Sequence, residues 1–322
     1  MSRKILVTGG AGFIGSNFIR YMLDKYPHYE ILNYDLLTYA GNPENVRDLE
    51  KRDNYDFVHG DILDTPKLDI LRGIDAIINF AAESHVDRSI GKPGNFISTN
   101  VMGTLSLLEM CKTRRISRFI QVSTDEVYGS KKKGSFKERD RLDPSSPYSA
   151  SKASADLLAL SYYKTHKVPV IVTRSSNNYG PYQYPEKLIP LFTTNAIRDE
   201  RLPIYGDGQN VRDWIYVEDN CSALDAVLHK GLVGQIYNIG GGNEITNNEI
   251  SEIILEKLSK PDSLVSFVRD RPGHDFRYSI NCDKVKKLGW EPSYNFEDAM
   301  EKTIEWYKDN PDWWKPLLES RS

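Results

Sequence analysis

Two residues four positions apart, Tyr148 and Lys152, form a pair that can take a proton from an alcohol. A tyrosine hydroxyl has an unperturbed pKa of about 10. A lysine ammonium one helical turn away favours the phenolate, which can then accept the proton of a sugar or alcohol hydroxyl. The spacing alone is weak evidence, because such a pair on a helix is usually an ordinary surface pair.

Two adjacent carboxylates, Asp125 and Glu126, precede this pair. If oxidation gives a ketone beside a C–H bond, Glu126 can remove that proton while a protonated Asp125 donates to the departing hydroxide. The neighbouring Thr124 can hydrogen-bond the oxidised oxygen and stabilise developing charge. The alternative is a helix N-terminal pair favoured by the helix dipole. Together with Tyr148 and Lys152, the carboxylates predict oxidation followed by elimination, with these five residues as the catalytic set.

The local sequence predicts where the carboxylates lie. Arg118 to Val122 is typical of a buried strand, so Ser123 to Glu126 would lie at its carboxyl end, where open α/β sheets bind ligands. Adjacent side chains of an extended chain point to opposite sides. Both carboxylates can therefore face one ligand only if the strand has already ended in a turn, and we predict that turn.

A glycine turn follows the first predicted strand. The β-rich run Lys4 to Thr8 leads into Gly9, Gly12 and Gly15, and an amphipathic stretch from Ser16 to Lys25 comes next. This succession of strand, turn and helix lets the backbone approach a pyrophosphate at a helix N-terminus. The turn therefore predicts a dinucleotide site.

The second predicted strand identifies the dinucleotide. Glu30 to Tyr34 ends in Asp35, twenty residues after Gly15. An acidic residue at this point can hydrogen-bond the 2′-hydroxyl of the adenosine ribose. Because a carboxylate repels a 2′-phosphate, Asp35 favours NAD over NADP.

Two further strand-like runs end in residues that suit a nearby dinucleotide. The run at 56–59 leads to Asp61, and the run at 76–80 leads to Ala81 and Ala82. Small residues let a cofactor lie close to the backbone. The alternative readings are a turn residue for Asp61 and simple packing for the two alanines.

The order of elements predicts the fold class. Strands alternate with helices, one of them from Thr99 to Thr113, which predicts an α/β fold with a Rossmann-type doubly wound parallel sheet. After Val170 to Arg174 the alternation ends, and a region with several Pro, Gly and Tyr predicts a smaller, mixed α/β substrate-binding lobe. Tyr179, Tyr182 and Tyr205 could stack on a base or line a pocket there; the alternative is that they cover the core.

Bulk properties exclude several classes of function. The 322 residues hold 42 Lys and Arg against 45 Asp and Glu, so a nucleic-acid partner is not expected. No run approaches the roughly 18 apolar residues of a membrane helix, and we expect no membrane partner. Widely spaced cysteines are compatible with a reducing cytosol and predict a cytoplasmic location. The six histidines show no ligand spacing, so no metal site is expected.

The motifs together resemble the extended short-chain dehydrogenase/reductase family of nucleotide-sugar enzymes. The resemblance rests on the glycine turn and on Asp35, Asp61, Ala81, Ala82, Tyr148 and Lys152. Within this family, the segment from Thr124 to Gly129 resembles the sugar-nucleotide 4,6-dehydratases, because 4-epimerases generally lack the acidic pair. The similarity covers essentially the whole chain, including the segments 177–183, 203–208, 212–214 and 271–275.

The resemblance implies an activity and a set of contacts. The activity is conversion of dTDP-glucose to dTDP-4-keto-6-deoxy-glucose by C4 oxidation, loss of water across C5 and C6, and return of the hydride to C6, in deoxysugar precursor biosynthesis. NAD would stay bound through turnover, and the enzyme would be a homodimer. The implied cofactor-binding positions are Gly9, Gly12, Phe13, Ile14, Gly15, Asp35, Asp61, Ile62, Ala81, Ala82, Ser84, Thr99, Ser123, Tyr148, Lys152 and Asn178. The implied substrate-binding positions are Ser84, Thr124, Asn177, Lys187, Leu188, Pro203, Tyr205, Arg212, Asn247, Arg271, His274 and Asp275.

Arg212 and Arg271 suit a diphosphate, because a guanidinium binds phosphate oxygens in a bidentate manner, although each alone would more often form a surface salt bridge. The sequence does not fix the nucleotide base. Two rival functions remain open. One is a nucleotide-sugar 4-epimerase or decarboxylase on the same scaffold, and the other is an NAD-binding protein without catalysis.

The family pattern also implies a discontinuous division of the chain. Residues 1–177 and 211–239 would form the NAD-binding domain, and 178–210 and 240–322 the sugar-nucleotide-binding lobe. Within these parts we predict a helix over 214–228, a strand at 235–240 and a helix over 298–308. Trp313 and Trp314 are predicted to be packing anchors.

Overall fold

The computed structural model describes residues 3–69, 71–114 and 116–319. Its largest element is a seven-stranded sheet in the order β10-β6-β5-β4-β1-β2-β3, in which every neighbouring pair is parallel. The strands are β1 Lys4–Thr8, β2 Glu30–Asp35, β3 Tyr55–His59, β4 Ala76–Asn79, β5 Arg118–Thr124, β6 Val170–Ser175 and β10 Ile236–Ile239.

The strand order reverses between β1 and β4. From β1 the chain builds β2 and β3 on one side of the sheet, and then β4, β5, β6 and β10 on the other. In open α/β sheets the crevice at such a switch point, outside the carboxyl ends of the strands, binds the ligand. The predicted doubly wound parallel sheet is confirmed.

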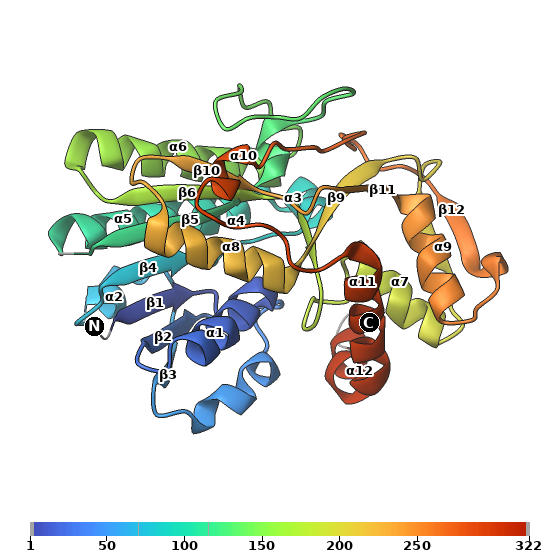
Figure 1. The fold of residues 1–322 in the computed structure, drawn as a ribbon, viewed down its shortest axis with the longest axis horizontal. Helices are drawn as coiled ribbons and strands as arrows, with labels where there is room; N and C mark the ends of the chain where they lie inside the picture. Colours follow the sequence, from blue (N-terminus) through green and yellow to red (C-terminus); the bar gives the residue numbers. More distant parts are fainter. Residues whose placement is uncertain (1–2, 70, 115, 320–322) are drawn as a thin grey trace.

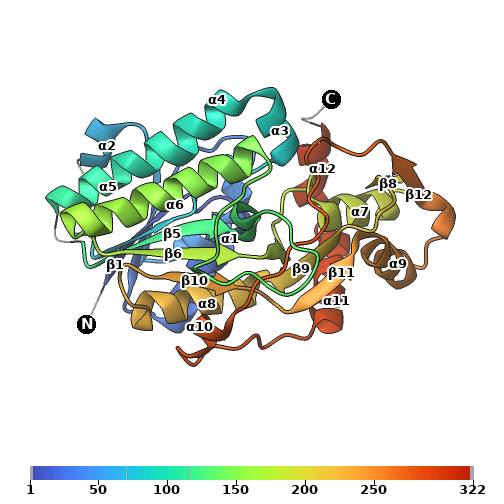
Figure 2. The same cartoon turned by 90° about the horizontal axis from the view of Figure 1, so that it is seen from above.

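Helices cover both faces of this sheet (Figures 1 and 2). Helices α1, Phe13–Lys25, and α8, Val217–Lys230, pack together on one face, and α5, Thr104–Thr113, and α6, Pro147–His166, pack together on the other. The alternation of side chains along β1 explains both layers. Ile5 and Val7 belong to the core that includes Phe18 of α1, whereas Leu6 belongs to the core that includes Leu107 and Leu108 of α5.

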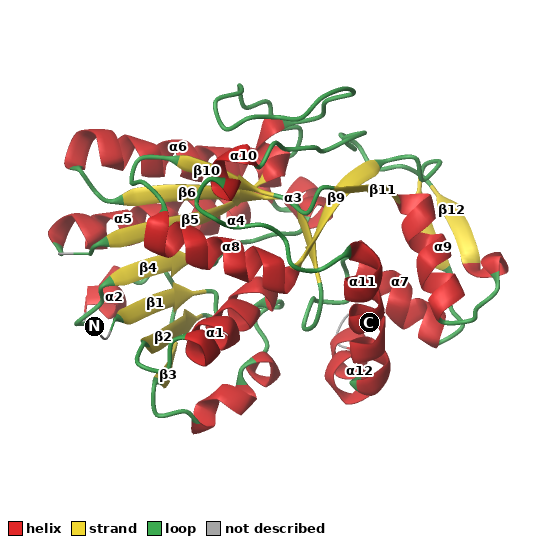
Figure 3. Cartoon of the chain, in the orientation of Figure 1, coloured by secondary structure: helices red, strands yellow, loops and turns green. Residues whose placement is uncertain are grey.

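A smaller lobe lies beyond the carboxyl ends of the parallel strands (Figure 3). It holds a three-stranded sheet in the order β11-β9-β7 and a pair of parallel strands, β12 and β8. The bounds are β7 Asn177–Tyr179, β8 Leu202–Tyr205, β9 Val211–Tyr216, β11 Asn243–Thr246, β12 Val265–Val268, α7 Leu188–Ile197, α9 Asn247–Lys257, α11 Phe296–Asp309 and α12 Pro311–Glu319.

Short helices complete the described part of the chain. They are α2 Thr65–Asp69, α3 Val86–Gly91, α4 Pro93–Phe96 and α10 Asp283–Lys286, with 3-10 turns η1 Pro43–Asn45, η2 Arg47–Lys51, η4 Asp125–Tyr128 and η5 Asp262–Leu264 and the π-helical segment η3 Ile97–Gly103. The helix predicted from Thr99 to Thr113 therefore consists of a π-helical turn followed by α5. Among the described residues, no helix has the length and apolar character needed to cross a membrane.

One boundary predicted in the second half of the chain is wrong. The helix predicted over 214–228 begins only at Val217, because Trp214 to Tyr216 form the end of strand β9, which pairs with both β7 and β11. Of the two alternatives for Tyr179, the structure favours the core, since the residue is 1% exposed and packs against the ring of Trp214. The proposed two-part division of the chain stays a proposal, with β9 in the sheet of the lobe and α8 against α1.

Candidate functional site

A cavity lies at the switch point, along the carboxyl ends of the parallel strands. Its wall includes every expected cofactor-binding position and all five expected catalytic residues. Of the expected substrate-binding positions, it includes Ser84, Thr124, Asn177 and Lys187. The expected positions that do not line this cavity are Leu188, Pro203, Tyr205, Arg212, Asn247, Arg271, His274 and Asp275.

The glycine turn at one end of the cavity has the geometry of a dinucleotide cradle. Gly9 has φ +71°, and a Cβ there would lie 2.6 Å from the backbone nitrogen of Ala81. A Cβ on Gly15 would lie 2.4 Å from the carbonyl oxygen of Gly9. Gly12 is the N-cap of α1, so the turn delivers free backbone amides to the cavity at a helix N-terminus. Any larger side chain at Gly9 or Gly15 would force the turn apart.

The carboxylate of Asp35 closes the same end of the cavity. Its Oδ2 accepts a hydrogen bond from the backbone N–H of Ala11 at 2.9 Å, and its Oδ1 accepts one from Leu37 at 2.8 Å. The residue is 8% exposed, and burial raises the pKa of its carboxyl while these two amides oppose the rise. Asp35 therefore has two tasks, since it anchors the glycine turn and presents a carboxylate to the cavity.

Buried polar atoms in the cavity wall fit a polar ligand. Asn177 Oδ1, Asn178 Oδ1, Gln183 Oε1 and Asp125 Oδ2 have no hydrogen-bond partner among the described residues. A buried polar atom left unpaired costs about 1–3 kcal/mol. A dinucleotide and a sugar carry hydroxyl and amide donors that can satisfy such acceptors, so the residues present fit NAD and a nucleotide sugar.

The two carboxylates lie where the predicted turn places them. Strand β5 ends at Thr124 and a 3-10 turn begins at Asp125. The hydroxyl of Thr124 caps this turn by accepting a hydrogen bond from the N–H of Glu126 at 3.2 Å. The turn is confirmed, and it brings both Asp125 and Glu126 to the cavity wall.

The surroundings of Asp125 favour its protonated form. Burial raises the pKa of this carboxyl well above its ordinary value, and the negative charges of Glu126 and Asp213 add to the rise, against a smaller lowering by Arg212. Asp125 is only 2% exposed. Asp213, on β9, is a further buried carboxyl whose pKa is raised by burial to about 6. A protonated Asp125 is equipped to donate a proton.

The surroundings of Glu126 are different. Burial is the largest influence on this carboxyl and raises its pKa on balance, while the cations of Lys187, Arg271 and Arg212 oppose the rise. Cations nearby favour the ionised form. Both carboxyls therefore have a raised pKa, but the strongest charged neighbours of Asp125 are carboxylates and those of Glu126 are cations, a difference that assigns an acid and a base. Asp125 is thus suited to be the acid and Glu126 to be the base.

Helix α6 carries Tyr148 and Lys152. It begins with a capping box formed by Ser146 and Ser149 and with Pro147 at its first position, which puts Tyr148 in the first turn. Tyr148 is 9% exposed, and Lys152 is 5% exposed. The fixed start of the helix therefore holds both side chains at the cavity.

Lys152 has a buried backbone partner in the structure. Its ammonium donates to the carbonyl oxygen of Val122 at 2.6 Å, and burial lowers its pKa to about 8. Burial raises the pKa of the Tyr148 hydroxyl well above its ordinary value, followed by the charge of Glu126, while a hydrogen bond with Thr124 lowers it. The expected action of Lys152 on the Tyr148 phenolate stays a prediction.

The other expected substrate-binding residues form a cationic group beside Glu126. Arg212, 6% exposed, donates to the carbonyl oxygen of Asp275 at 3.0 Å and lies over the ring of Tyr278. Arg271 lies 3.6 Å from Asp87. The structure thus brings Arg212 and Arg271 close enough to Glu126 to lower its pKa, although neither lines the cavity itself.

The remaining expected positions lie outside this group or at its edge. His274 Nδ1 donates a hydrogen bond to Asp270 Oδ1 at 2.6 Å, and its ring contacts that of Tyr205 edge to face. Pro203 lies in β8, and Leu188 begins α7. Asn247, 5% exposed, begins α9. Of these residues, Asn247 has a buried side-chain oxygen, Oδ1, with no hydrogen-bond partner among the described residues.

Comparison with known proteins identifies the family of this chain. Residues 6–303 match the family described as GDP-mannose 4,6 dehydratase. The chain belongs to this family. The match spans both the parallel sheet and the lobe, so the resemblance expected from the motifs is confirmed.

Three relatives show how far the similarity extends. The low-salt glycan biosynthesis protein Agl12 of Haloferax volcanii is 53% identical over 94% of this chain and 98% of its own length. The dTDP-glucose 4,6-dehydratase of Bacillus anthracis, solved in complex with NAD, is 55% identical with a TM-score of 0.92, covering 98% of this chain and 99% of that one. The dTDP-glucose 4,6-dehydratase of Streptomyces venezuelae, solved with NAD and dTDP bound, is 50% identical with a TM-score of 0.96 and the same coverage.

Several residues of the site were not predicted from the sequence. Glu83 and Glu186 line the cavity, as does Gln183. The side chain of Asn100, in the π-helical segment, holds both the N–H and the carbonyl oxygen of Glu83. His85 is kept neutral, because burial and the charge of Lys187 lower its pKa to about 4. Only their position in the sequence could have indicated that Glu83 and Glu186 belong to the site. Glu83 follows the end of β4, and Glu186 precedes the expected Lys187.

Proposed function

We propose that this chain catalyses the dTDP-glucose 4,6-dehydratase reaction, converting dTDP-glucose to dTDP-4-keto-6-deoxy-glucose and water with NAD as a retained cofactor. The observation that carries the proposal is the pair Asp125 and Glu126 on one cavity wall, where the strongest charged neighbours of Asp125 are carboxylates and those of Glu126 are cations. Membership of a family of 4,6-dehydratases supports it. Neither an epimerase nor a protein that only binds NAD requires such a pair.

The oxidation step uses Tyr148 and Thr124. Tyr148 takes the proton of the sugar C4 hydroxyl, and the hydroxyl of Thr124, which interacts with Tyr148, hydrogen-bonds the C4 oxygen. When bound, NAD accepts the hydride from C4 and returns it to C6 at the end of the cycle. Gly9, Gly12 and Gly15 would hold its pyrophosphate and Asp35 its adenosine ribose.

The elimination step uses the two carboxylates. The 4-keto group acidifies the C5 hydrogen, which Glu126 removes as a proton. Asp125 gives its proton to the C6 oxygen, the C6–O bond breaks, and water leaves as the C5–C6 double bond forms. Glu126 then returns its proton to C5 when C6 receives hydride. Tyr148 releases to solvent the proton that it took from the C4 hydroxyl, and Asp125 takes one proton from solvent, so the protons balance and no net oxidation or reduction remains.

The cations beside Glu126 support a nucleotide diphosphate as the rest of the substrate. Arg212 and Arg271 are suited to phosphate oxygens, and Lys187, which donates to the carbonyl of Ser84 at 2.8 Å, is held at the cavity edge. Relatives that act on dTDP-glucose, one of them solved with dTDP bound, support thymidine as the nucleoside.

We also propose a cytoplasmic homodimer. Met102 of η3 and Leu157 of α6 are 48% and 59% exposed, and both belong to the helical layer on one face of the sheet. Exposed large apolar side chains on neighbouring helices suit a second copy of the chain. Light scattering during gel filtration measures the mass directly, and a monomer at micromolar concentration would overturn the dimer.

The proposed reaction has a direct test. Incubation of the protein with dTDP-glucose should give a product lighter by one water molecule that carries a 4-keto group, detected by mass spectrometry and by its absorbance in alkali. A product of unchanged mass with inverted C4 would instead identify an epimerase. Absence of any reaction while NAD remains bound would identify a binding protein.

The cofactor assignment predicts the behaviour of Asp35→Asn. The asparagine keeps one acceptor for the backbone amides of the turn but loses the negative charge, so we expect NAD affinity to fall about 10- to 100-fold, since hydrogen bonds to charged groups contribute about 1.5–3 kcal/mol. The preference for NAD over NADP should shrink, because repulsion of the 2′-phosphate is lost. Calorimetric titration with both cofactors measures this.

The residues after Asp35 determine how the variant should bind NADP. No Lys or Arg occurs between Asp35 and Arg47, so no basic residue in that stretch is available for a 2′-phosphate. The variant should therefore bind NADP weakly as well. If the wild-type protein preferred NADP, or if Asp35→Asn left both affinities unchanged, the assignment of Asp35 would be wrong.

A further inference from the structure

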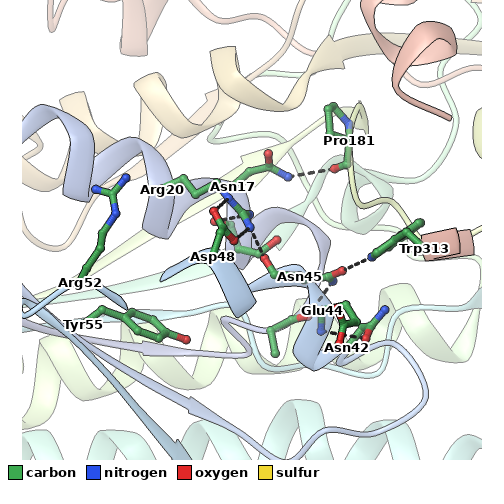
Figure 4. Close-up of polar contacts among 12 residues, drawn as sticks. Asn17, Arg20, Asn42, Glu44, Asn45, Asp48, Arg52, Tyr55, Pro181 and Trp313 are labelled. Atoms are coloured by element: carbon green, nitrogen blue, oxygen red, sulfur yellow. Dashed lines mark hydrogen bonds and ion pairs between the residues drawn. The ribbon is translucent and has the colours of Figure 1, made fainter. Parts of the chain in front are cut away.

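We propose that Trp313 and Asn45 form a latch by which the C-terminal helix of the lobe fixes the glycine turn and so slows release of NAD. The indole Nε1 of Trp313, in α12, donates to Asn45 Oδ1 at 2.8 Å. Asn45 Nδ2 in turn donates to the carbonyl oxygen of Ala11, inside the glycine turn, at 2.8 Å. Figure 4 shows the indole of Trp313 reaching across to Asn45. The inference rests on the proposed function, because it assumes that NAD occupies the glycine turn.

The donor character of the indole determines how Asn45 is oriented. A Trp Nε1–H can only donate, so the oxygen of the Asn45 amide must face Trp313. The NH₂ group of that amide then necessarily faces the carbonyl of Ala11. Asn45 is 1% exposed, so no solvent is available to replace either bond. Without the indole, Asn45 Oδ1 loses its donor, and the amide is held at one end only, by the carbonyl of Ala11.

The hydrogen bonds continue from Ala11 to the proposed ribose site. The N–H of Ala11 donates to Asp35 Oδ2 at 2.9 Å, and the carbonyl of Ala11 also accepts from the N–H of Asn42 at 3.0 Å. Ala11 itself is fully buried. A shift of the Asn45 amide therefore reaches the two peptide groups that flank Ala11, one with the carbonyl that Asn45 holds and the other with the N–H that Asp35 holds.

A second set of contacts joins the same two regions, so the latch is not one isolated bond. Asn17 Nδ2, in α1, donates to the carbonyl oxygen of Pro181 at 3.0 Å (Figure 4). The guanidinium of Arg20 lies 4.4 Å from the ring centre of Tyr182. Tyr182 has the left-handed φ of +67° and packs against the ring of Trp306. Gln183, the next residue, lines the cavity.

The proposed reaction explains why such a latch is useful. The hydride taken from C4 must return to C6 of the same sugar. If NADH dissociated between the two steps, the enzyme would hold a 4-keto intermediate that it could not reduce at C6. A link from the substrate lobe to the glycine turn holds the turn closed during this interval. Trp313 and Asn45 are positioning residues, since neither lines the cavity.

Trp313→Phe is the test, because it removes the N–H and keeps an aromatic ring. The probe is NADH bound to the full-length protein, and its fluorescence is followed after an excess of NAD is added. We expect the dissociation rate of NADH to rise about fivefold, the value of one hydrogen bond of about 1 kcal/mol. The maximal rate of turnover at saturating NAD should be unchanged.

Trp314→Phe is the matched control. Trp314 lies in the same helix, is 1% exposed, and donates its Nε1–H to the carbonyl of Tyr307 at 2.7 Å, a bond that stays within the lobe. This variant should lower the unfolding temperature without changing the dissociation rate of NADH. Equal rates for Trp313→Phe and Trp314→Phe would overturn the latch.

The variant Asn45→Ala, alone and combined with Trp313→Phe, completes a double-mutant cycle. If Trp313 acts through Asn45, then Trp313→Phe should have no further effect on NADH dissociation once Asn45 is replaced. A full additional fivefold effect in that background would show that Trp313 acts by another route. If the wild-type protein bound neither NAD nor NADH, the proposed cofactor site would be wrong, which is a different result from failure of the latch.

Discussion

Tyr148→Phe should lower the rate of C4 oxidation by about 10²- to 10⁴-fold, the usual contribution of a general base. The substitution removes only the hydroxyl, and the ring remains packed against Phe96 at a centroid distance of 6.3 Å. Thr124 cannot replace the base, because its hydroxyl is far less acidic than a phenol. Rapid quenching of a single turnover, with detection of the 4-keto-glucose intermediate, measures the step.

Glu126→Gln is the control for this prediction. It keeps the hydroxyl of Tyr148 and removes a negative charge that raises the Tyr148 pKa, so C4 oxidation should proceed while elimination fails. The 4-keto-glucose intermediate should therefore accumulate in Glu126→Gln and not in Tyr148→Phe. Equal loss of the intermediate in both variants would show that Tyr148 does not act in oxidation, and Glu126 in elimination, as proposed.

Much of the site could be predicted because its residues lie at the ends of parallel strands. Thr124, Asp125 and Glu126 follow a buried apolar run, and the carboxyl ends of parallel strands meet at one edge of the sheet. The turn needed for both carboxylates to face one ligand follows from the alternation of side chains along a strand. Local sequence and strand geometry were therefore sufficient to predict that these residues meet at the cavity, whereas their catalytic roles stay a proposal.

Other features depend on contacts between distant segments, which one sequence does not reveal. Asp213, which lies 88 positions after Asp125, is a carboxyl that raises its pKa, and it belongs to a strand that was expected to be partly helical. Tyr179 is a core residue because β7 pairs with β9. Trp313 was predicted as a packing anchor, but its indole N–H reaches Asn45, 268 positions away.

The partner that Lys152 binds also depends on a distant segment. The four-residue spacing puts both side chains on one face of α6, but Lys152 finds a buried acceptor, the Val122 carbonyl, at 2.6 Å. Burial already lowers the pKa of Lys152 to about 8, and its ammonium is stabilised where that carbonyl lies. Spacing on a helix predicts proximity of two side chains, whereas the strand beneath the helix decides which partner is bound.

The second large effect is expected for Asp125→Asn, which should slow elimination from dTDP-glucose by about 10²- to 10⁴-fold. Hydroxide is a poor leaving group, so the C6 oxygen needs a proton, and the raised pKa of Asp125 keeps that proton available. An asparagine of the same shape cannot donate it as an acid. C4 oxidation should continue, and the measurement is the ratio of 4-keto-glucose to 4-keto-6-deoxy-glucose in a quenched turnover.

The pH dependence of stability shows that the variant is folded and that Asp125 carries a proton. The folded pKa of Asp125 lies well above its unfolded value, which for a free Asp is about 3.9. A carboxyl with a raised folded pKa stabilises the protein most below the unfolded value, and this stability is lost as pH rises through the folded value. The unfolding temperature of the wild-type protein should therefore fall more on going to alkaline pH than that of Asp125→Asn.

A substrate with a better leaving group separates proton donation from positioning. Fluoride at C6 leaves without first being protonated, so Asp125→Asn should eliminate fluoride from dTDP-6-fluoro-glucose at nearly the wild-type rate, whereas Glu126→Gln should remain impaired with both substrates. The contrast follows from the chemistry, because Glu126 must still remove the C5 proton. If Asp125→Asn eliminated fluoride as slowly as it eliminates water, the buried carboxyl of Asp125 would act by orienting the sugar, and the acid would have to be sought elsewhere on the cavity wall.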